Sequence, residues 1–235
     1  MTSTTAEVLV IQHEDDCPPG VLGEVLATCT RPVRVVRGYE GETIPQTLDG
    51  VAALIVLGGG MGACEDADHA WLAPTRDLIR RARQEELPTL GICLGAQMAA
   101  VALDGSMGRA AEPEVGMCAI TLTPEGEEDP VLSALPRQAT VFQWHQDAIT
   151  DLPEDAVLLA GGPGGMVQAY RSGPCLWATQ FHPEVNAEIV VEWARTSSLR
   201  PVDTPPEHYG TSLQADTDAV AQWRALLEAF LAQVR

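Results

Sequence analysis

The segment Gly91-Ile-Cys-Leu-Gly95 is the part of the sequence best suited to covalent chemistry. An apolar run enters it, a helical pattern leaves it, and a thiol lies at the turn between them, as in a nucleophile elbow with sulfur in place of oxygen. The flanking glycines allow a turn too tight for a Cβ atom. The N-terminus of the following helix favours the thiolate form. We predict that Cys93 is a catalytic nucleophile; the alternative is a small buried cysteine in a core strand.

A thiolate nucleophile needs a base and a group that orients the base. Among the five histidines, His182 directly follows the apolar run 175–181, which is typical of a strand. Pro183 stiffens the turn, and Glu184 is placed where its carboxylate could hold the second nitrogen of the imidazole. These residues predict a Cys-His-Glu triad. The alternative is a surface-loop histidine with no catalytic task.

The same chemistry needs N–H donors for a tetrahedral oxyanion. The glycine run 58–60 follows a buried apolar segment and could aim backbone N–H groups at the same edge, and the N–H of Leu94 is a natural second donor. The alternative for these glycines is a tight turn. A second glycine-rich stretch, 161–165, links two strand-like runs and is interpreted as a turn. Neither stretch matches GxGxxG or a P-loop, so nucleotide binding has little support.

Strand-like and helical segments alternate along the first half of the chain. Apolar runs without alternation are typical of strands buried on both faces. Strands are expected at 8–11, 33–36, 52–57 and 89–93, and helices at 21–26, 71–87 and 96–103. Short links between them predict a parallel sheet with helices on both faces. We predict an α/β fold with three layers and a mostly parallel, open, flavodoxin-like sheet.

The second half of the chain has more strands and fewer helices. Strand-like runs lie at 117–122, 139–142, 156–160, 166–170 and 175–181, and helical patterns lie at 186–195 and 218–234. We expect these strands to extend the same sheet in antiparallel or mixed fashion. The Pro-rich stretch 199–212 is predicted to be a loop. No linker separates two parts, so residues 1–235 are predicted to form one domain.

Composition excludes several classes of protein. The chain has 14 Lys+Arg against 33 Asp+Glu, a net charge of −19, and every basic residue is arginine. Such an acidic chain repels phosphate backbones and anionic lipid, so we expect neither nucleic acid nor a membrane as partner. The absence of lysine excludes a Walker-type lysine, a Schiff-base lysine and a pyridoxal-phosphate enzyme.

The spacing of the cysteines and the N-terminal residues limit which cofactors and which cellular compartment are expected. The six cysteines contain no CxxC pair and no zinc-site spacing, so no metal and no cofactor are expected. The chain starts without a basic stretch or an apolar signal-peptide core, and no apolar run approaches the ~20 residues of a membrane helix. We expect a cytoplasmic enzyme with reduced thiols.

The glycine loop, Gly91-Ile-Cys-Leu-Gly-Ala-Gln97 and Phe181-His-Pro-Glu184 together resemble the class I (triad) glutamine amidotransferases. The likeness extends from Val8 to about Val191 and is greatest to free-standing proteins similar to the glutaminase domain of guanosine monophosphate synthase. The stretch Gln143-Trp-His-Gln-Asp147 is similar to the family segment that closes over the substrate.

The resemblance implies a role for individual positions. Cys93 would attack the side-chain amide of glutamine and form a γ-glutamyl thioester with release of ammonia. His182 would transfer the protons, and Glu184 would orient His182. Gly59, at the position of the family's loop glycine, and Leu94 would hold the oxyanion. Glutamine itself would be bound by three further residues: Gln97, His145 and Gln146.

Some features depart from the family pattern. Gly60 replaces a proline that the family loop often has, which affects the rigidity of the loop. About 45 residues follow Val191, too few for a synthetase domain, so we expect any ammonia acceptor to be a separate synthetase. The stretch Ala111-Glu-Pro-Glu-Val-Gly116 is also family-like, but it suggests no role for Glu114.

Four functions remain open from the sequence. The first is a glutamine amidohydrolase that acts alone or supplies ammonia to a partner. The second is a γ-glutamyl peptidase or hydrolase whose small-molecule substrate is a γ-glutamyl compound larger than glutamine. The third is a non-catalytic binding subunit, which an intact triad disfavours. The fourth is a member of the related redox-chaperone and protease group, which would require a glutamate near the elbow and no strand-end His-Pro-Glu.

Overall fold

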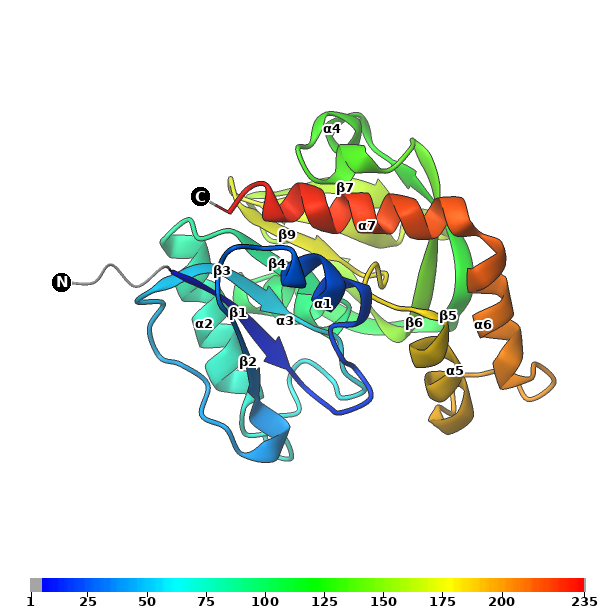
Figure 1. Cartoon of the computed structure of the whole chain (residues 1–235), viewed down its shortest axis with the longest axis horizontal. Helices are drawn as coiled ribbons and strands as arrows, with labels where there is room; N and C mark the ends of the chain where they lie inside the picture. The colour runs from blue at the N-terminus through cyan, green and yellow to red at the C-terminus, as the bar shows by residue number, and fades with distance from the viewer. Residues whose placement is uncertain (1–5, 235) are drawn as a thin grey trace.

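Nine strands form one mixed sheet in the order β2-β1-β3-β4-β9-β8-β7-β5-β6 (Figure 1). The computed structural model describes residues 6–234; residues 1–5, where we expect no signal peptide, and residue 235 lie outside the described residues. The strands are β1 (Glu7–Gln12), β2 (Val33–Arg37), β3 (Val51–Val56), β4 (Thr89–Ile92), β5 (Ser106–Leu122), β6 (Gln138–Asp151), β7 (Ala156–Gly161), β8 (Val167–Ser172) and β9 (Leu176–Thr179). The first four and β9 pair in parallel, and the others are antiparallel.

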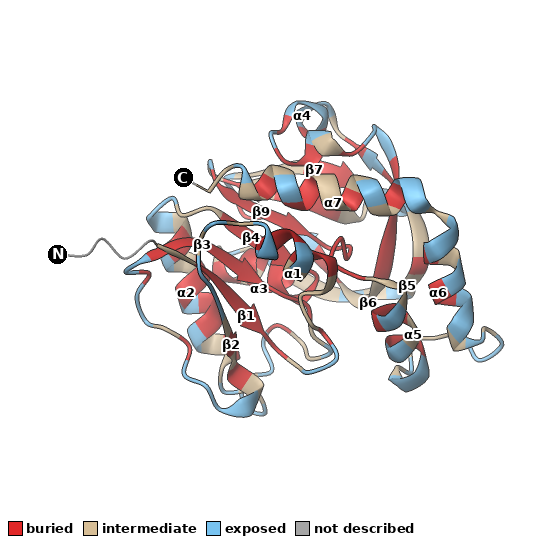
Figure 2. Ribbon diagram, viewed as in Figure 1, coloured by how far each residue is buried: buried red, intermediate tan, exposed pale blue. Residues whose placement is uncertain are grey.

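Helices cover both faces of the parallel part of the sheet. Along β1, Val8 and Val10 pack into one hydrophobic cluster with α1 (Gly20–Ala27) and α7 (Thr217–Leu231). Leu9 and Ile11 pack into the other cluster, with α2 (Leu72–Gln84) and α3 (Leu94–Ala102). Successive strand residues point to opposite faces, so a run that is apolar at every position fills two cores. Figure 2 shows the buried strands between helices with exposed outer faces. The predicted three-layer α/β fold is confirmed.

The antiparallel part is dominated by the hairpin of β5 and β6. Both strands are longer than the predicted runs 117–122 and 139–142, because β5 begins at Ser106 and β6 ends at Asp151. The added part of β5 contains Gly, Ala, Glu and Pro, and the added part of β6 contains Gln, His and Asp. Residues of these types are mostly depleted in strands, so cross-strand pairing rather than local preference makes them strands. The register shifts between Arg109 and Glu114, which lie opposite Asp147 and His145.

The C-terminal part contains one helix that the sequence did not suggest. The prediction of a loop over 199–212 is wrong in its second half, because α6 (Pro206–Ala215) begins there. Proline is well tolerated at the first position of a helix. Tyr209 and Leu213, one turn apart, are buried, and the Tyr209 ring meets Trp144 edge-on at 5.1 Å. Packing on the hairpin thus stabilises a helix whose local sequence looks irregular.

The other predicted elements are present, with short additional turns. The helix predicted at 186–195 is α5 (Ala187–Thr196). The additional elements are α4 (Pro124–Glu128) and 3-10 turns at Gly38–Glu40, Leu132–Ala134 and Pro163–Gly165. Within residues 6–234, no helix combines the length and the apolar character that crossing a membrane requires. The carboxyl ends of the neighbouring parallel strands β4 and β9 meet at one sheet edge, which is where open α/β sheets place their sites.

Candidate active site

Cys93 lies on a strained turn between β4 and α3. Its backbone has φ 49° and ψ −104°, in the region that favours glycine. A Cβ on Gly91 would lie 2.7 Å from the carbonyl carbon of Gly95, and a Cβ on Gly95 would lie 2.1 Å from the carbonyl oxygen of Val56. Both glycines are therefore required by close backbone contacts. The predicted elbow is present, and the N-terminus of α3 places the positive end of its dipole at the sulfur.

His182 and Glu184 follow β9 at the same edge. Nδ1 of His182 lies 2.7 Å from Oε1 of Glu184, and both side chains are buried. The N–H of His182 donates to the carbonyl of Phe142 at 2.9 Å, and the ring of Trp193 meets the imidazole edge-on at 4.7 Å. Nε2 of His182 is buried and makes no hydrogen bond within residues 6–234. The imidazole is thus fixed at one nitrogen and available at the other.

Two negative charges set the protonation of His182. Burial on its own lowers the pKa of the imidazole, but the charges of Glu184 and Cys93 outweigh it and raise the pKa to about 10. The ring therefore carries its proton at neutral pH beside the sulfur of Cys93. A positively charged neighbour of this kind favours the thiolate form on which a cysteine nucleophile depends.

The glycine loop after β3 lies against this pair. A Cβ on Gly58 would lie 3.0 Å from Cε1 of His182 and 3.6 Å from Cβ of Cys93. A Cβ on Gly59 would lie 2.9 Å from Cδ2 of Leu94. In the described part of the chain, the backbone N–H groups of Gly59 and Leu94 have no hydrogen-bond acceptor. The loop and the helix start thus present two unused donors near the sulfur.

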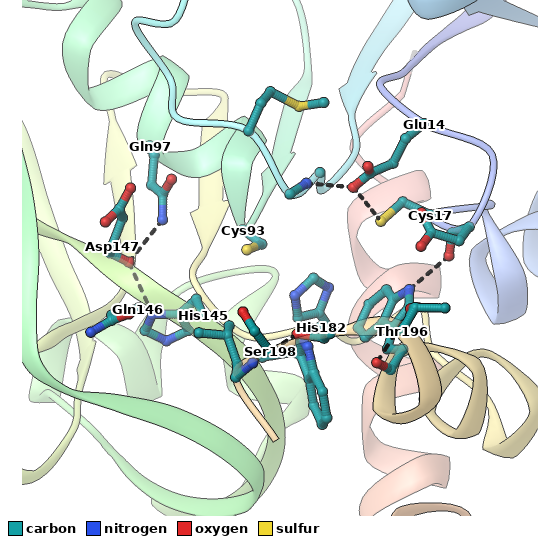
Figure 3. Close-up of a pocket in the computed structure, with 18 of the residues that line it drawn as sticks. Glu14, Cys17, Cys93, Gln97, His145, Gln146, Asp147, His182, Thr196 and Ser198 are labelled. Atoms are coloured by element: carbon teal, nitrogen blue, oxygen red, sulfur yellow. Dashed lines mark hydrogen bonds between the residues drawn. The ribbon is translucent and has the colours of Figure 1, made fainter. Parts of the chain in front are cut away.

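These groups open into a cavity of about 540 Å³. Figure 3 shows Cys93 and His182 in its middle, with Gln97, Gln146 and Asp147 on one side and Glu14 and Cys17 on the other. The wall beyond His182 is formed by Trp193 and the residues from Thr196 to Leu199. The cavity therefore has two chemically different ends on either side of the sulfur.

The three predicted glutamine-binding residues all line the first end, but each is also held by the protein. Nε2 of Gln97 donates to the carbonyl of Asp147 at 2.9 Å and to Oε1 of Gln180 at 3.3 Å. Nδ1 of His145 lies 3.0 Å from the same carbonyl. Oε1 of Gln146 accepts from the guanidinium of Arg109. The amide of Gln97 and the ring of His145 thus order the wall of the cavity.

Several residues of this network have roles that sequence reasoning missed. Oε2 of Glu114 lies 3.2 Å from Nε2 of His145 and accepts from Nε2 of Gln168 at 2.6 Å. Although burial alone raises the pKa of Glu114, its hydrogen bonds with His145 and Gln168 lower it. Nε2 of Gln180 donates to the sulfur of Cys93 at 3.6 Å. Only the position of Gln180, directly before Phe181-His-Pro-Glu184, could have marked it in advance.

The opposite end of the cavity is acidic. Donor atoms of Glu14, Asp16 and Cys17 lie within 4.8 Å of one another. The carboxylate of Glu14 accepts from the N–H of Gly60 and, at 3.4 Å, from the Cys17 thiol. Burial raises the pKa of Cys17 well above its usual value, so this sulfur is a protonated donor rather than a thiolate.

Comparisons with known proteins agree with this geometry. The "Glutamine amidotransferase class-I" family profile matches residues 22–189. One subunit of the glutamine-hydrolyzing GMP synthase of Thermoplasma acidophilum is 32% identical over 163 residues, covering 66% of this chain and 78% of the relative. "Gamma-glutamyl peptidase 5" of Arabidopsis thaliana is 29% identical over 178 residues, covering 72% of this chain and 70% of the relative.

A solved structure extends the similarity to nearly the full length. The crystal structure of a glutamine amidotransferase from Thermotoga maritima has a TM-score of 0.86 and 26% identity, and 98% of each chain is covered. The profile match spans well over half of the chain and includes both the cysteine elbow and the His-Pro-Glu turn. The chain belongs to the class-I glutamine amidotransferase family.

Proposed function

We propose that this protein hydrolyses the side-chain amide of glutamine through a γ-glutamyl thioester on Cys93 and releases ammonia. One observation carries the proposal: the strained Cys93 lies beside a buried His182 that Glu184 holds at 2.7 Å. The family match and the similarity to the GMP synthase of Thermoplasma support the choice of glutamine.

The acylation step follows from the positions of these groups. The Cys93 thiolate attacks the amide carbon, the C–S bond forms, and the carbonyl electron pair moves onto oxygen. The N–H groups of Gly59 and Leu94 stabilise that oxyanion. When the oxyanion collapses, the C–N bond breaks and the proton on Nε2 of His182 goes to the leaving nitrogen, which departs as ammonia.

Deacylation uses the same residues in reverse. The thioester carries no charge on sulfur, so one of the two anions that raise the pKa of His182 is lost and the neutral ring becomes a suitable base. It takes a proton from water, the hydroxide attacks the thioester, and the C–S bond breaks to give glutamate and the thiolate. Glu184 keeps the imidazole oriented in both steps.

A separate protein would take up the ammonia in this proposal. The Thermoplasma relative is named as one subunit of its enzyme, which supports an arrangement in which a distinct synthetase chain consumes what this chain releases.

A second candidate substrate is a larger γ-glutamyl compound. Cavities of about 300–1,000 Å³ accommodate drug-sized ligands, and the cavity of about 540 Å³ continues past Cys93 to a wall at Thr196–Leu199. This extra space would admit a leaving group larger than ammonia, and the γ-glutamyl peptidase relative supports that interpretation. The chemistry at the thioester would be identical.

Steady-state assays separate the two substrates. We would measure ammonia released from L-glutamine and glutamate released from γ-glutamyl dipeptides, with Cys93→Ala as the blank. A higher kcat/KM for glutamine supports the first proposal, and a higher value for a dipeptide supports the second. Both proposals would be contradicted if the protein turned over none of these compounds and Cys93 formed no adduct with a glutamine-mimicking electrophile. Mass spectrometry detects that adduct.

A further inference from the structure

The glycine loop 58–60 follows β3 and contains no side chain that could fix its backbone. Before it, the N–H of Leu57 donates to the carbonyl of Ile11 at 3.0 Å, and after it the carbonyl of Gly62 accepts at 3.1 Å. Consecutive glycines have no Cβ atoms to restrict their φ and ψ. Between these two points, a peptide plane could turn and carry the N–H of Gly59 away from the reacting oxygen.

One hydrogen bond ties the middle of this stretch to the rest of the protein. Among residues 6–234, the only hydrogen bond made by the stretch 58–61 is donated by the N–H of Gly60 to the carboxylate of Glu14. A bond to an ionised acceptor is stronger than one between neutral groups. It fixes the peptide plane between Gly59 and Gly60 and therefore restrains the backbone of Gly59, which presents the oxyanion donor.

Glu14 is itself held where the chain leaves β1. Nε2 of Gln12 donates to its backbone carbonyl at 2.9 Å, and the thiol of Cys17 donates to its carboxylate at 3.4 Å. The thiol and the N–H of Gly60 share one oxygen, Oε1. Figure 3 shows the Glu14 carboxylate between the glycine loop and Cys17, with a dashed line to each. The carboxylate is thus a fixed anchor for the loop.

The residue before Glu14 packs under the same loop. A Cβ on Gly59 would lie 3.0 Å from the Cβ of His13. Nδ1 of His13 accepts from Nε1 of Trp71 at 3.1 Å, and burial together with His69 lowers the pKa of His13 to about 3. His13 is therefore a neutral packing contact, and Glu14 supplies the charged contact that can orient a peptide plane.

We propose that Glu14 is a positioning residue: its hydrogen bond with the N–H of Gly60 holds the glycine loop in the conformation that stabilises the oxyanion. Glu14 would act through the backbone of the loop rather than on the substrate. The inference rests on the proposed function in one respect, because it requires Cys93 to form tetrahedral oxyanions, whichever acyl compound the sulfur attacks.

Two reagents separate oxyanion stabilisation from the reactivity of the sulfur. p-Nitrophenyl acetate acylates a thiolate through a tetrahedral oxyanion and releases p-nitrophenolate, whereas iodoacetamide alkylates it by direct displacement of iodide, with no oxyanion. Mass spectrometry of the Cys93 peptide gives a rate constant for each. Glu14→Ala should slow acylation by about 10- to 100-fold, because a displaced donor loses much of its stabilising effect. Alkylation should change by less than about threefold, since it depends on the thiolate alone.

A conservative variant and a neighbouring variant are the controls. Glu14→Gln keeps an oxygen that accepts from the N–H of Gly60, so its acylation rate should stay within about threefold of wild type. Asp15→Ala removes an exposed acidic residue that does not line the cavity, and it should change neither rate. The inference would be overturned by wild-type acylation in Glu14→Ala, by equal losses with both reagents, or by a Gln variant as slow as the Ala variant.

Turnover of glutamine distinguishes a failure of this inference from a failure of the proposed function. Glu14→Ala should lower kcat by about 10- to 100-fold and leave KM within about twofold, because the oxyanion exists only after the sulfur attacks. An unchanged kcat would contradict the inference and leave glutamine hydrolysis intact. A wild type that cleaves no γ-glutamyl compound, while Glu14→Ala still loses acylation selectively, would contradict the proposed function alone.

Discussion

The site is built from two regions that hold their residues by different means. At the edge of β4 and β9, backbone geometry places the reacting groups: Cys93 has a strained φ of 49°, and Gly95 leaves no space for a side chain. In the β5–β6 hairpin, side chains hold other side chains, as Glu114 holds His145. The difference indicates that the first region tolerates almost no added atom, whereas changes in the second have graded effects.

The largest effect is expected at the sulfur. Cys93→Ala should lower kcat by at least about 10⁵-fold, because nothing else can form the thioester. The free energy of unfolding should stay within about 1 kcal/mol, since alanine has the same Cβ at the strained position. His182→Asn should be similarly inactive. Cys64→Ala, at an exposed free cysteine, is the control and should keep full activity; more than a tenth of wild-type turnover in Cys93→Ala would rule out the nucleophile.

Glu184→Gln should have the next largest effect, about 10³-fold on kcat, because an amide still orients the ring in part but removes its charge. The pKa of His182 is about 10 in the folded protein against an ordinary value of 6.5. The folded state therefore keeps a proton that the unfolded state loses, and the free energy of unfolding should fall as the pH rises from 6.5 to about 10.

The charge on Glu184 is one cause of that pH dependence, so the variant should show a smaller fall over the same window. Urea unfolding at a series of pH values measures it. Identical slopes in wild type and variant would show that the carboxylate does not raise the pKa of His182.

Gly95→Ala tests the claim that backbone contacts build the first region. The new Cβ would meet the carbonyl oxygen of Val56 at 2.1 Å, so we expect a loss of about 3 kcal/mol or more in the free energy of unfolding. Gly23→Ala, within α1, is the matched control, because its new Cβ would lie 3.4 Å from the Cβ of Pro19. It should be neutral or stabilising by up to about 1 kcal/mol. Equal urea midpoints for the two variants would argue against a tightly packed elbow.

The smallest effect is expected in the hairpin. Glu114→Gln keeps the shape of the side chain but removes the charge that faces His145. We expect KM to rise about tenfold with kcat within about twofold, since a charged hydrogen bond is replaced by a neutral one. Glu125→Gln, exposed on α4, should change neither constant. A loss confined to kcat would mean that the hairpin acts on the chemistry rather than on the substrate.

Patterns in consecutive residues were sufficient to predict the first region, at the edge of β4 and β9. The cysteine between two close glycines, the His-Pro-Glu turn and the unbroken apolar strands each depend on local rules of turn geometry and burial. Val8 and Leu9 show this well, because a doubly buried strand must be apolar at successive positions. These patterns therefore predicted the elbow, the parallel sheet and the candidate triad.

Only the tertiary structure decided the second region. The pairing of Glu114 with His145, the hydrogen bond from Arg109 to Gln146 and the helix at Pro206–Ala215 arise from the register of β5 against β6 and from packing on that hairpin. The local sequence around 106–116 has no alternation and suits several conformations. Contacts between residues far apart in the chain select one of them, because their hydrogen bonds and buried area outweigh weak local preferences.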